Sequence, residues 1–89
     1  MDDLVTKTTE LLRAEFPGSD VEIETWKASD RLSGSLTWKG FLGKDQVKRQ
    51  RKVWKALRAH LSPDEWARIA AIFTFTPAEM AVMREDTGD

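Results

Sequence analysis

The sequence contains no cysteine and only one histidine, His60. Without thiols, disulfides, thiol catalysis and thiolate metal sites within the chain are excluded. A lone histidine has no second imidazole or thiolate with which to hold a metal ion, so we expect no metal site and no other cofactor. Its place near the end of a basic helix instead favours an interaction with the helix C-terminus, where a protonated ring complements the helix dipole.

Long apolar runs are also missing. No segment approaches the ~18 apolar residues of a membrane span, and the acidic start, Met1-Asp2-Asp3, lacks the basic and apolar regions of a signal peptide. We therefore expect a cytoplasmic protein that does not enter a membrane. The length of 89 residues, with 40% hydrophobic and 33% charged residues, fits one globular domain spanning 1–89.

Signatures of catalysis are lacking as well. No spacing suggests a nucleophile beside a general base, and the chain has neither a Walker motif nor a dinucleotide fingerprint. We therefore expect a binding protein rather than an enzyme.

The apolar pattern predicts an α+β fold in the order helix, strand, strand, helix, strand, helix. The short connection between the first two strands indicates an antiparallel hairpin. Ser62-Pro63-Asp64-Glu65 and Thr76-Pro77-Ala78-Glu79 read as capping boxes that begin helical segments. The expected helices cover 3–16, a basic segment after Gly43 that runs to about Leu61, a short turn at 63–67 and a last helix from 77, with strands at 21–25, 32–38 and 68–75. The polar tail 84–89 is expected to fray.

Positive charge is concentrated between Lys44 and Arg58, where seven basic residues accompany one acid. This segment carries a net charge of +6, whereas the rest of the chain carries −7. On an α-helix, five of the cations would form a stripe roughly 80° wide: Lys44, Lys48, Arg51, Lys55 and Arg58. Such a stripe is either a binding surface or a solvated helix face. A separate arc, expected to face the core, holds Val47, Val53, Trp54, Leu57 and Leu61.

Three further residues beside or within the basic helix have expected structural roles. Gln50 lies in the middle of the apolar arc, so we expect its amide to bond to sheet or hairpin backbone rather than to a ligand. Gly40 and Gly43, which bracket Phe41, are candidates for backbone conformations that other residues avoid. Gly43 fits a tight turn, and it also fits a phosphate contact at the start of the helix.

Two separated motifs resemble those of the BolA-like family. Phe41-x-Gly43, followed after five residues by Arg49-Gln50-Arg51-x-Val53-Trp54, is similar to the family's Phe-x-Gly and Arg-His-Arg signature. The segment from Thr74 to Glu79 is similar to its closing Thr-aromatic-Thr-Pro-x-Glu motif. The resemblance covers roughly residues 4–83 and implies a three-stranded mixed sheet with helices on one side, close to the type II KH topology. Within the matching segment, we expect structural roles for Phe41, Gln50 and Trp54.

The resemblance also implies a small, non-enzymatic protein. Some family members bind DNA and regulate transcription, and many pair with monothiol glutaredoxins and share a [2Fe–2S] cluster. The family's cluster histidine corresponds to Arg68 in this chain, and the loop from Thr25 to Leu32 contains no histidine or cysteine. Arginine stays protonated and is not a cluster ligand. We therefore expect no cluster ligation by the family's usual residues.

Two functional hypotheses follow, beside the possibility that the stripe only keeps the protein soluble. In the first, Lys44, Lys48, Arg51, Lys55 and Arg58 contact the phosphates of DNA or RNA, and Gly43 positions the helix start. In the second, the same face docks an acidic protein of the iron–sulfur or redox-stress pathway, such as a monothiol glutaredoxin.

Overall fold

The computed structural model describes residues 3–26 and 28–87. Four α-helices and three strands occur in the expected order, with a 3₁₀ helix, η1, at Lys39–Phe41. The α-helices are α1 (Asp3–Glu15), α2 (Gln46–His60), α3 (Pro63–Ala67) and α4 (Pro77–Thr87), and the strands are β1 (Asp20–Thr25), β2 (Leu32–Thr37) and β3 (Ile69–Phe75). The α+β fold class is therefore confirmed.

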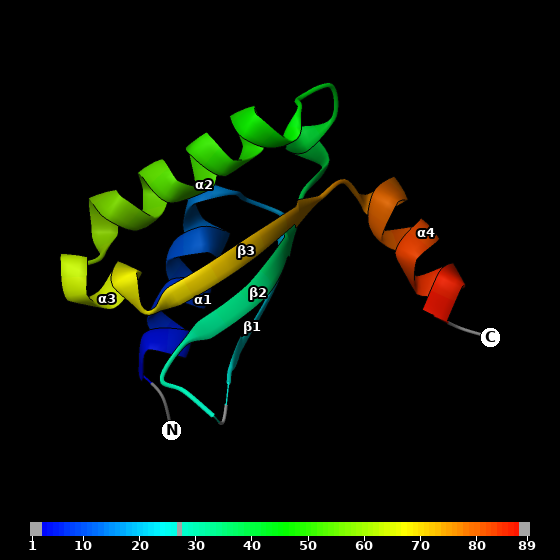
Figure 1. Ribbon diagram of the computed structural model, residues 1–89. Coiled ribbons are helices and arrows are strands. Elements are labelled where there is room, and N and C mark those ends of the chain that lie inside the picture. Colours follow the sequence, from blue (N-terminus) through cyan, green and yellow to red (C-terminus); the bar gives the residue numbers. More distant parts are fainter. Residues whose placement is uncertain (1–2, 27, 88–89) are drawn as a thin grey trace.

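The strands form one mixed sheet in the order β1-β2-β3. β1 and β2 form the expected antiparallel hairpin, and β3 pairs with β2 in parallel after a register irregularity at Leu32 and Ser33. This order leaves β3 at an edge of the sheet, beside α2 (Figure 1).

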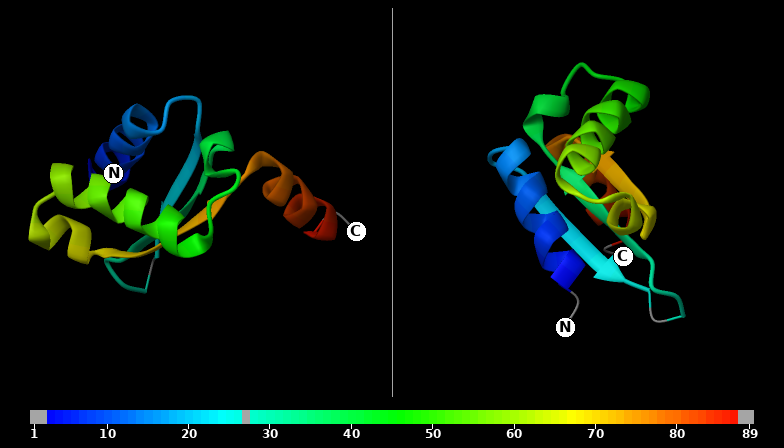
Figure 2. Two further views of the ribbon diagram at one scale, coloured as in Figure 1. Left: turned by 90° about the horizontal axis from the view of Figure 1, so that it is seen from above. Right: turned by 90° about the vertical axis from the view of Figure 1, so that its left-hand side faces the viewer.

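Helices α1 and α2 cover one face of the sheet, and the hydrophobic core fills the space between (Figures 1 and 2). Side chains alternate along each strand, so only one set reaches this core. The buried set includes Val21 of β1, Leu36 of β2 and Ile72 of β3. The other face carries no α-helix in either figure, and α4 projects beyond the end of β3.

Most element boundaries lie within a residue or two of those predicted. The short helix and the strand after it are confirmed at Pro63–Ala67 and Ile69–Phe75. The tail differs, because α4 continues to Thr87, so the segment expected to fray is helical as far as that residue. The last two positions of the predicted tail, 88–89, lie outside the described residues. Among residues 3–26 and 28–87, none of the helices combines the length and the apolar character of a membrane span.

Candidate functional site

The predicted stripe assumes a helix that includes Lys44, but α2 begins only at Gln46. Asp45 is its N-cap, and Asp45 Oδ1 accepts a hydrogen bond of 2.9 Å from the backbone N–H of Lys48. Ser, Thr, Asp and Asn are preferred at this position because they satisfy the first backbone donors of a helix. The cap sets the start of the helix at Gln46, so Lys44 lies in the preceding turn and not on the helix face, which corrects the predicted stripe. The cap also places a carboxylate, rather than free N–H groups, at this helix end.

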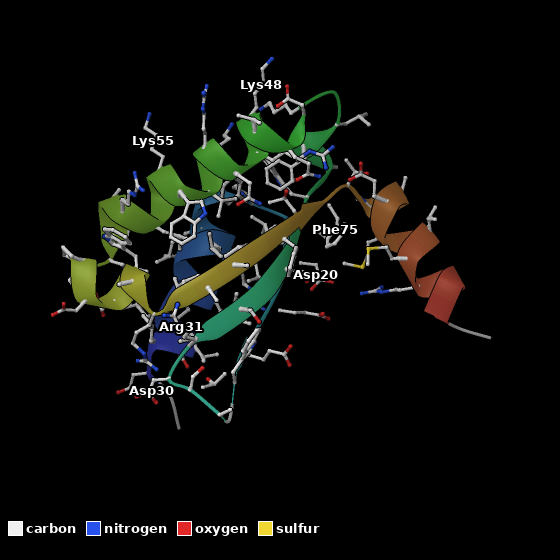
Figure 3. The ribbon with its side chains drawn as sticks, viewed as in Figure 1. Asp20, Asp30, Arg31, Lys48, Lys55 and Phe75 are labelled. Atoms are coloured by element: carbon white, nitrogen blue, oxygen red, sulfur yellow. The ribbon has the colours of Figure 1, made fainter. Side chains whose placement is uncertain are left out.

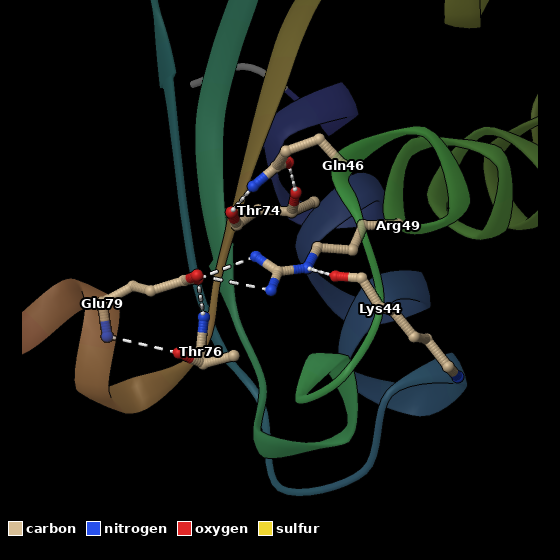
Figure 4. Close-up of polar contacts among 6 residues, drawn as sticks. All are labelled: Lys44, Gln46, Arg49, Thr74, Thr76 and Glu79. Carbon is tan, nitrogen blue, oxygen red and sulfur yellow. Dashed lines mark hydrogen bonds and ion pairs between the residues drawn. The ribbon is translucent and has the colours of Figure 1, made fainter.

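Lys44 lies in the turn, but it is still close enough to cations of α2 to be affected by their charge. Its side chain extends away from β3 and α4 (Figure 4), and the Lys52 ammonium of α2 is its dominant electrostatic neighbour. This neighbour, together with repulsion from Lys52 and Lys48, lowers the pKa of Lys44 below its ordinary value.

The other four predicted cations are exposed on α2: Lys48, Arg51, Lys55 and Arg58. Figure 3 shows Lys48 and Lys55 projecting outward from the helix, on the side away from the sheet. Arg58 also lies over the ring of Trp66 from α3, 5.3 Å from the ring centre. The structure therefore brings four of the five predicted residues together on one helix face.

A hollow of about 870 Å³ lies along this face of α2. Its lining includes two apolar side chains and one amide, from Val47, Trp54 and Gln50. Its cations come from Arg51, Lys55 and Arg58. Val47 was predicted to face the core, which is wrong, because its exposed fraction is 60%. The helix instead turns the arc of Arg49, Val53, Ala56 and Leu57 inward. Trp54 is half-buried and packs against the core, as its predicted structural role requires. It also lines the hollow.

Gln50 occupies the structural position predicted for it. Its Nε2 donates a hydrogen bond of 2.7 Å to the carbonyl oxygen of Ile72 in β3. One turn earlier, Gln46 Nε2 donates to Thr74 O at 3.3 Å and its Oε1 accepts from the Thr74 hydroxyl at 2.7 Å. Unpaired backbone groups on an edge strand invite association with other chains. The two glutamines therefore cover the free edge of β3.

Replacing Gln50 with methionine is expected to lower the free energy of unfolding by about 1 kcal/mol, because Ile72 O loses its donor while the side-chain length is kept. Urea denaturation followed by circular dichroism measures the difference. The matched control is Lys55→Met on the exposed face of the same helix, which is expected to change stability by less than about 0.5 kcal/mol. Equal effects of the two variants would contradict a structural role for the Gln50 hydrogen bond.

The turn before α2 confirms one predicted role for Gly43. Lys44 N donates to Phe41 O at 3.0 Å, Leu42 has φ −58° and ψ 130°, and Gly43 has φ +81°. These angles define a type II turn, whose third residue needs the positive φ that glycine adopts freely. Gly40 differs from the prediction, because its φ is not in the positive range. It is small for a steric reason, since a Cβ there would collide with the ring of Trp38.

Arg49 is the residue of this region that the predicted stripe missed. Its side chain is buried and forms an ion pair with Glu79 of α4, with Nη1–Oε1 and Nη2–Oε2 distances of 2.7 and 3.3 Å (Figure 4). Arg49 Nε also donates to Lys44 O at 2.8 Å. Glu79 Oε1 accepts from Thr76 N, which completes the predicted capping box of α4. One arginine thus ties the turn before α2 to the first turn of α4.

The Arg49–Glu79 pair predicts a defined pH dependence of stability. The Arg49 guanidinium, followed by the Thr76 N–H, lowers the pKa of Glu79 below its ordinary value of 4.5. A carboxyl whose pKa is lowered on folding stabilises the protein above its unfolded pKa, and this stabilisation disappears as the pH falls through the folded value. Glu79→Gln should therefore lower the melting temperature at pH 7, and the difference from the parent should vanish in acid.

Thermal unfolding followed by circular dichroism across this pH range measures the effect. Glu22→Gln is the control, because the Glu22 side chain has no hydrogen-bond or ion-pair partner among residues 3–26 and 28–87. A difference between Glu79→Gln and the parent that stays constant from pH 7 into acid would contradict the prediction.

Arg68, which corresponds to the family's cluster histidine, lies against the loop between β1 and β2. Its Nε donates a hydrogen bond of 2.8 Å to Asp30 O, and its own carbonyl accepts from Leu32 N at 2.9 Å. The two parts of the family's cluster site are therefore adjacent in this fold. They bring together a guanidinium and a backbone carbonyl, whereas a [2Fe–2S] cluster needs thiolate or imidazole ligands. The residues present do not fit the cluster.

Among the described residues, no group of three or more histidine, aspartate or glutamate side chains is arranged to hold a metal ion. His60 lies at the last position of α2, and its Nε2 is 2.8 Å from Glu15 Oε1 of α1. It therefore links two helices.

Comparison with known proteins bears on the fold. No protein-family model matches the sequence, and no curated protein matches it. BolA1 from Arabidopsis thaliana is similar in structure, with a TM-score of 0.69 and 27% identity over 89% of this chain and 98% of that one. The BolA domain of SufE1 from the same plant gives a TM-score of 0.68 and 22% identity, with the same coverage of both chains.

A bol-like protein from Babesia bovis is a third structural neighbour. Its TM-score is 0.65, with 21% identity over 90% of this chain and 92% of that chain. The three alignments cover 89–90% of this chain and 92–98% of the neighbours. The chain therefore has the BolA-like fold, and its structural neighbours are BolA-like proteins.

Proposed function

We propose that this protein is a non-enzymatic, BolA-like binding module whose α2 face binds nucleic acid, with a role in transcription regulation in the cytoplasm. One observation carries the proposal. Four exposed cations, Lys48, Arg51, Lys55 and Arg58, share the outward face of α2, and three of them border the hollow that holds Trp54. Lysine and arginine supply the phosphate contacts that dominate nucleic-acid affinity.

The hollow adds a second element to this surface. Cations alone would bind any polyanion, but Trp54 and Gln50 lie beside them in a concave site. Aromatic side chains next to a cationic track bind nucleobases by stacking. Gln50 Nε2 already donates a hydrogen bond to Ile72 O. In this proposal the bases are therefore contacted by the Trp54 ring and not by Gln50.

Fluorescence anisotropy with labelled single-stranded and duplex oligonucleotides tests the proposal. Four phosphate contacts predict that log affinity falls with log salt with a slope of about −3 on single strands and about −4 on duplex DNA. Binding at low salt with such a slope supports it. No binding at low salt, or an affinity that does not change with salt, would overturn it.

A second candidate function is docking of an acidic protein partner, such as a monothiol glutaredoxin, without a cluster ligand from this chain. Two exposed apolar side chains near the cations favour it, Val47 on α2 and Leu42 in the turn before it. A protein partner would remove both from water, whereas phosphates would not. A pull-down with a monothiol glutaredoxin from the same organism separates the candidates. A visible cluster spectrum that changes when this chain is added would contradict the absence of ligation.

A further inference from the structure

The sheet face opposite α1 and α2 has three rows of side chains that cross all three strands. The register aligns Asp20 with Thr37 and Phe75, Glu22 with Ser35 and Phe73, and Glu24 with Ser33 and Ala71. Residues aligned across a sheet point to the same face. Each row therefore reads acid on β1, small polar residue on β2 and apolar residue on β3.

This pattern makes a trough with two unlike walls. Neighbouring strands lie about 4.8 Å apart, so the acidic and apolar columns are about 10 Å apart across a shallow floor of small side chains. Met80 and Met83 of α4 extend the apolar wall. A hollow of about 640 Å³ includes Glu22, Glu24, Phe73 and Phe75 of the trough, and Thr9 of α1 also lines it. Figure 3 shows Asp20 and Phe75 near the end of the sheet that faces α4.

Each wall of the trough includes side chains that neither pack in the core nor form a polar contact. The exposed fraction of Phe73 is 59%, although it lies in the interior of β3. The side chains of Glu22 and Glu24 have no hydrogen-bond or ion-pair partner within the described part of the chain. Asp20 has a distant ion pair with Arg84, at 3.8 Å. The trough thus fits a partner helix with an apolar stripe beside a row of cations, since a helix with its side chains is about 10–12 Å wide.

The same chain carries a helix with this pattern. On α2, the exposed Val47 and half-buried Trp54 lie next to Arg51, Lys55 and Arg58. The segment 44–58 carries +6 and the rest of the chain −7, while the net charge of the whole is only −1. A net charge near zero promotes association, and charges split between two surfaces favour association between unlike surfaces.

We propose that the trough of one copy binds the outward face of α2 of a second copy. The two surfaces lie on opposite sides of the sheet, so they do not meet within one chain (Figures 1 and 2). The contact is therefore head-to-tail, which builds rings or open chains, and the assemblies grow with concentration. This inference goes beyond the proposed function, which concerns nucleic acid on α2. Because both use α2, nucleic acid would displace the second copy.

Sedimentation velocity of the whole chain tests the contact. The mass of the parent protein should rise with concentration at low salt and return to that of the monomer in about 1 M salt, where the screening length is about 3 Å. A parent protein that stays monomeric at low salt up to millimolar concentration would overturn the proposal, whether or not it binds nucleic acid.

Two variants identify the surfaces. Glu22→Lys with Glu24→Lys reverses two of the three acids of the trough and leaves α2 intact. Lys55→Gln with Arg58→Gln removes two cations of α2 and leaves the trough intact. Each alone should associate at least about tenfold more weakly than the parent protein. Mixed in equal amounts, they retain one trough and one α2 face between them, and should form a 1:1 dimer that does not grow.

All these substitutions are at exposed positions, and circular dichroism checks that the variants are folded. The assignment of the surfaces would be overturned if either variant alone associated as strongly as the parent protein. It would also be overturned if the mixture remained monomeric while the parent protein associated. Failure of nucleic-acid binding would leave every outcome of this experiment unchanged, because no nucleic acid is present.

Discussion

Replacing Phe41 with alanine is expected to lower the free energy of unfolding by about 3–5 kcal/mol, which is a large share of the stability of a small domain. Phe41 is completely buried at the end of η1. Its ring meets Trp38 edge-on at 5.2 Å and Phe16 at 5.6 Å between ring centres. The Arg49 guanidinium lies 5.8 Å from its ring centre. The change would leave a cavity among groups that belong to separate elements.

Urea denaturation followed by tryptophan fluorescence and by circular dichroism measures the loss. The matched control is the neighbouring Leu42→Ala, because the exposed fraction of Leu42 is 79%, and its effect should be within about 0.5 kcal/mol. A loss below about 1 kcal/mol for Phe41→Ala would contradict its structural role, which would then leave the Phe41-x-Gly43 motif to be explained by binding.

The order of elements could be predicted because local sequence rules and tertiary packing agree. The two capping boxes illustrate this agreement. Ser62 and Glu65 exchange hydrogen bonds at the start of α3, and Thr76 and Glu79 do so at the start of α4. Each box needs only residues three apart, so it can be read from the chain alone.

The rotation of α2 was less predictable than its existence. Periodicity separates a helix into arcs, but it does not say which arc the sheet will cover. Val47 was assigned to the core for its apolar side chain, whereas Arg49 was placed neither in the core nor in the stripe. In the structure Val47 is exposed and Arg49 is buried, and the carboxylate partner of Arg49, Glu79, lies thirty residues later in the chain. Spacing alone offered a signal, since Arg49, Val53 and Ala56 recur at i, i+4 and i+7.

The sequence does not show which side chains of β3 face the core, because the pairing of β2 and β3 contains an irregularity. Strict alternation would place Ile69, Ala71 and Phe73 on one face. The register shift at Leu32 and Ser33 changes this, so that Ile69 is buried in the core while Phe73 is exposed on the other face. Such an irregularity depends on both strands, and it decides which aromatic side chains are available to a partner.

The largest functional effect is expected from the double variant Lys48→Glu, Arg51→Glu. If α2 binds duplex DNA through four phosphate contacts, the loss of two should reduce the salt slope from about −4 to about −2. Since each contact contributes about 0.9 log units per decade of salt below 1 M, affinity at about 0.1 M salt should fall by about 50-fold or more. Anisotropy titrations at several salt concentrations measure both quantities.

The variant should stay folded, which keeps the result interpretable. Both side chains are exposed, and position 48 is the third residue of α2 after the Asp45 cap, where glutamate is favoured in capping boxes. The matched control is Arg13→Glu, Arg31→Glu, which reverses two exposed charges outside α2. The control changes the net charge by the same amount, so it separates local contacts from overall repulsion. If the two double variants lost equal affinity, binding would depend on net charge, and the α2 face would not be the nucleic-acid site.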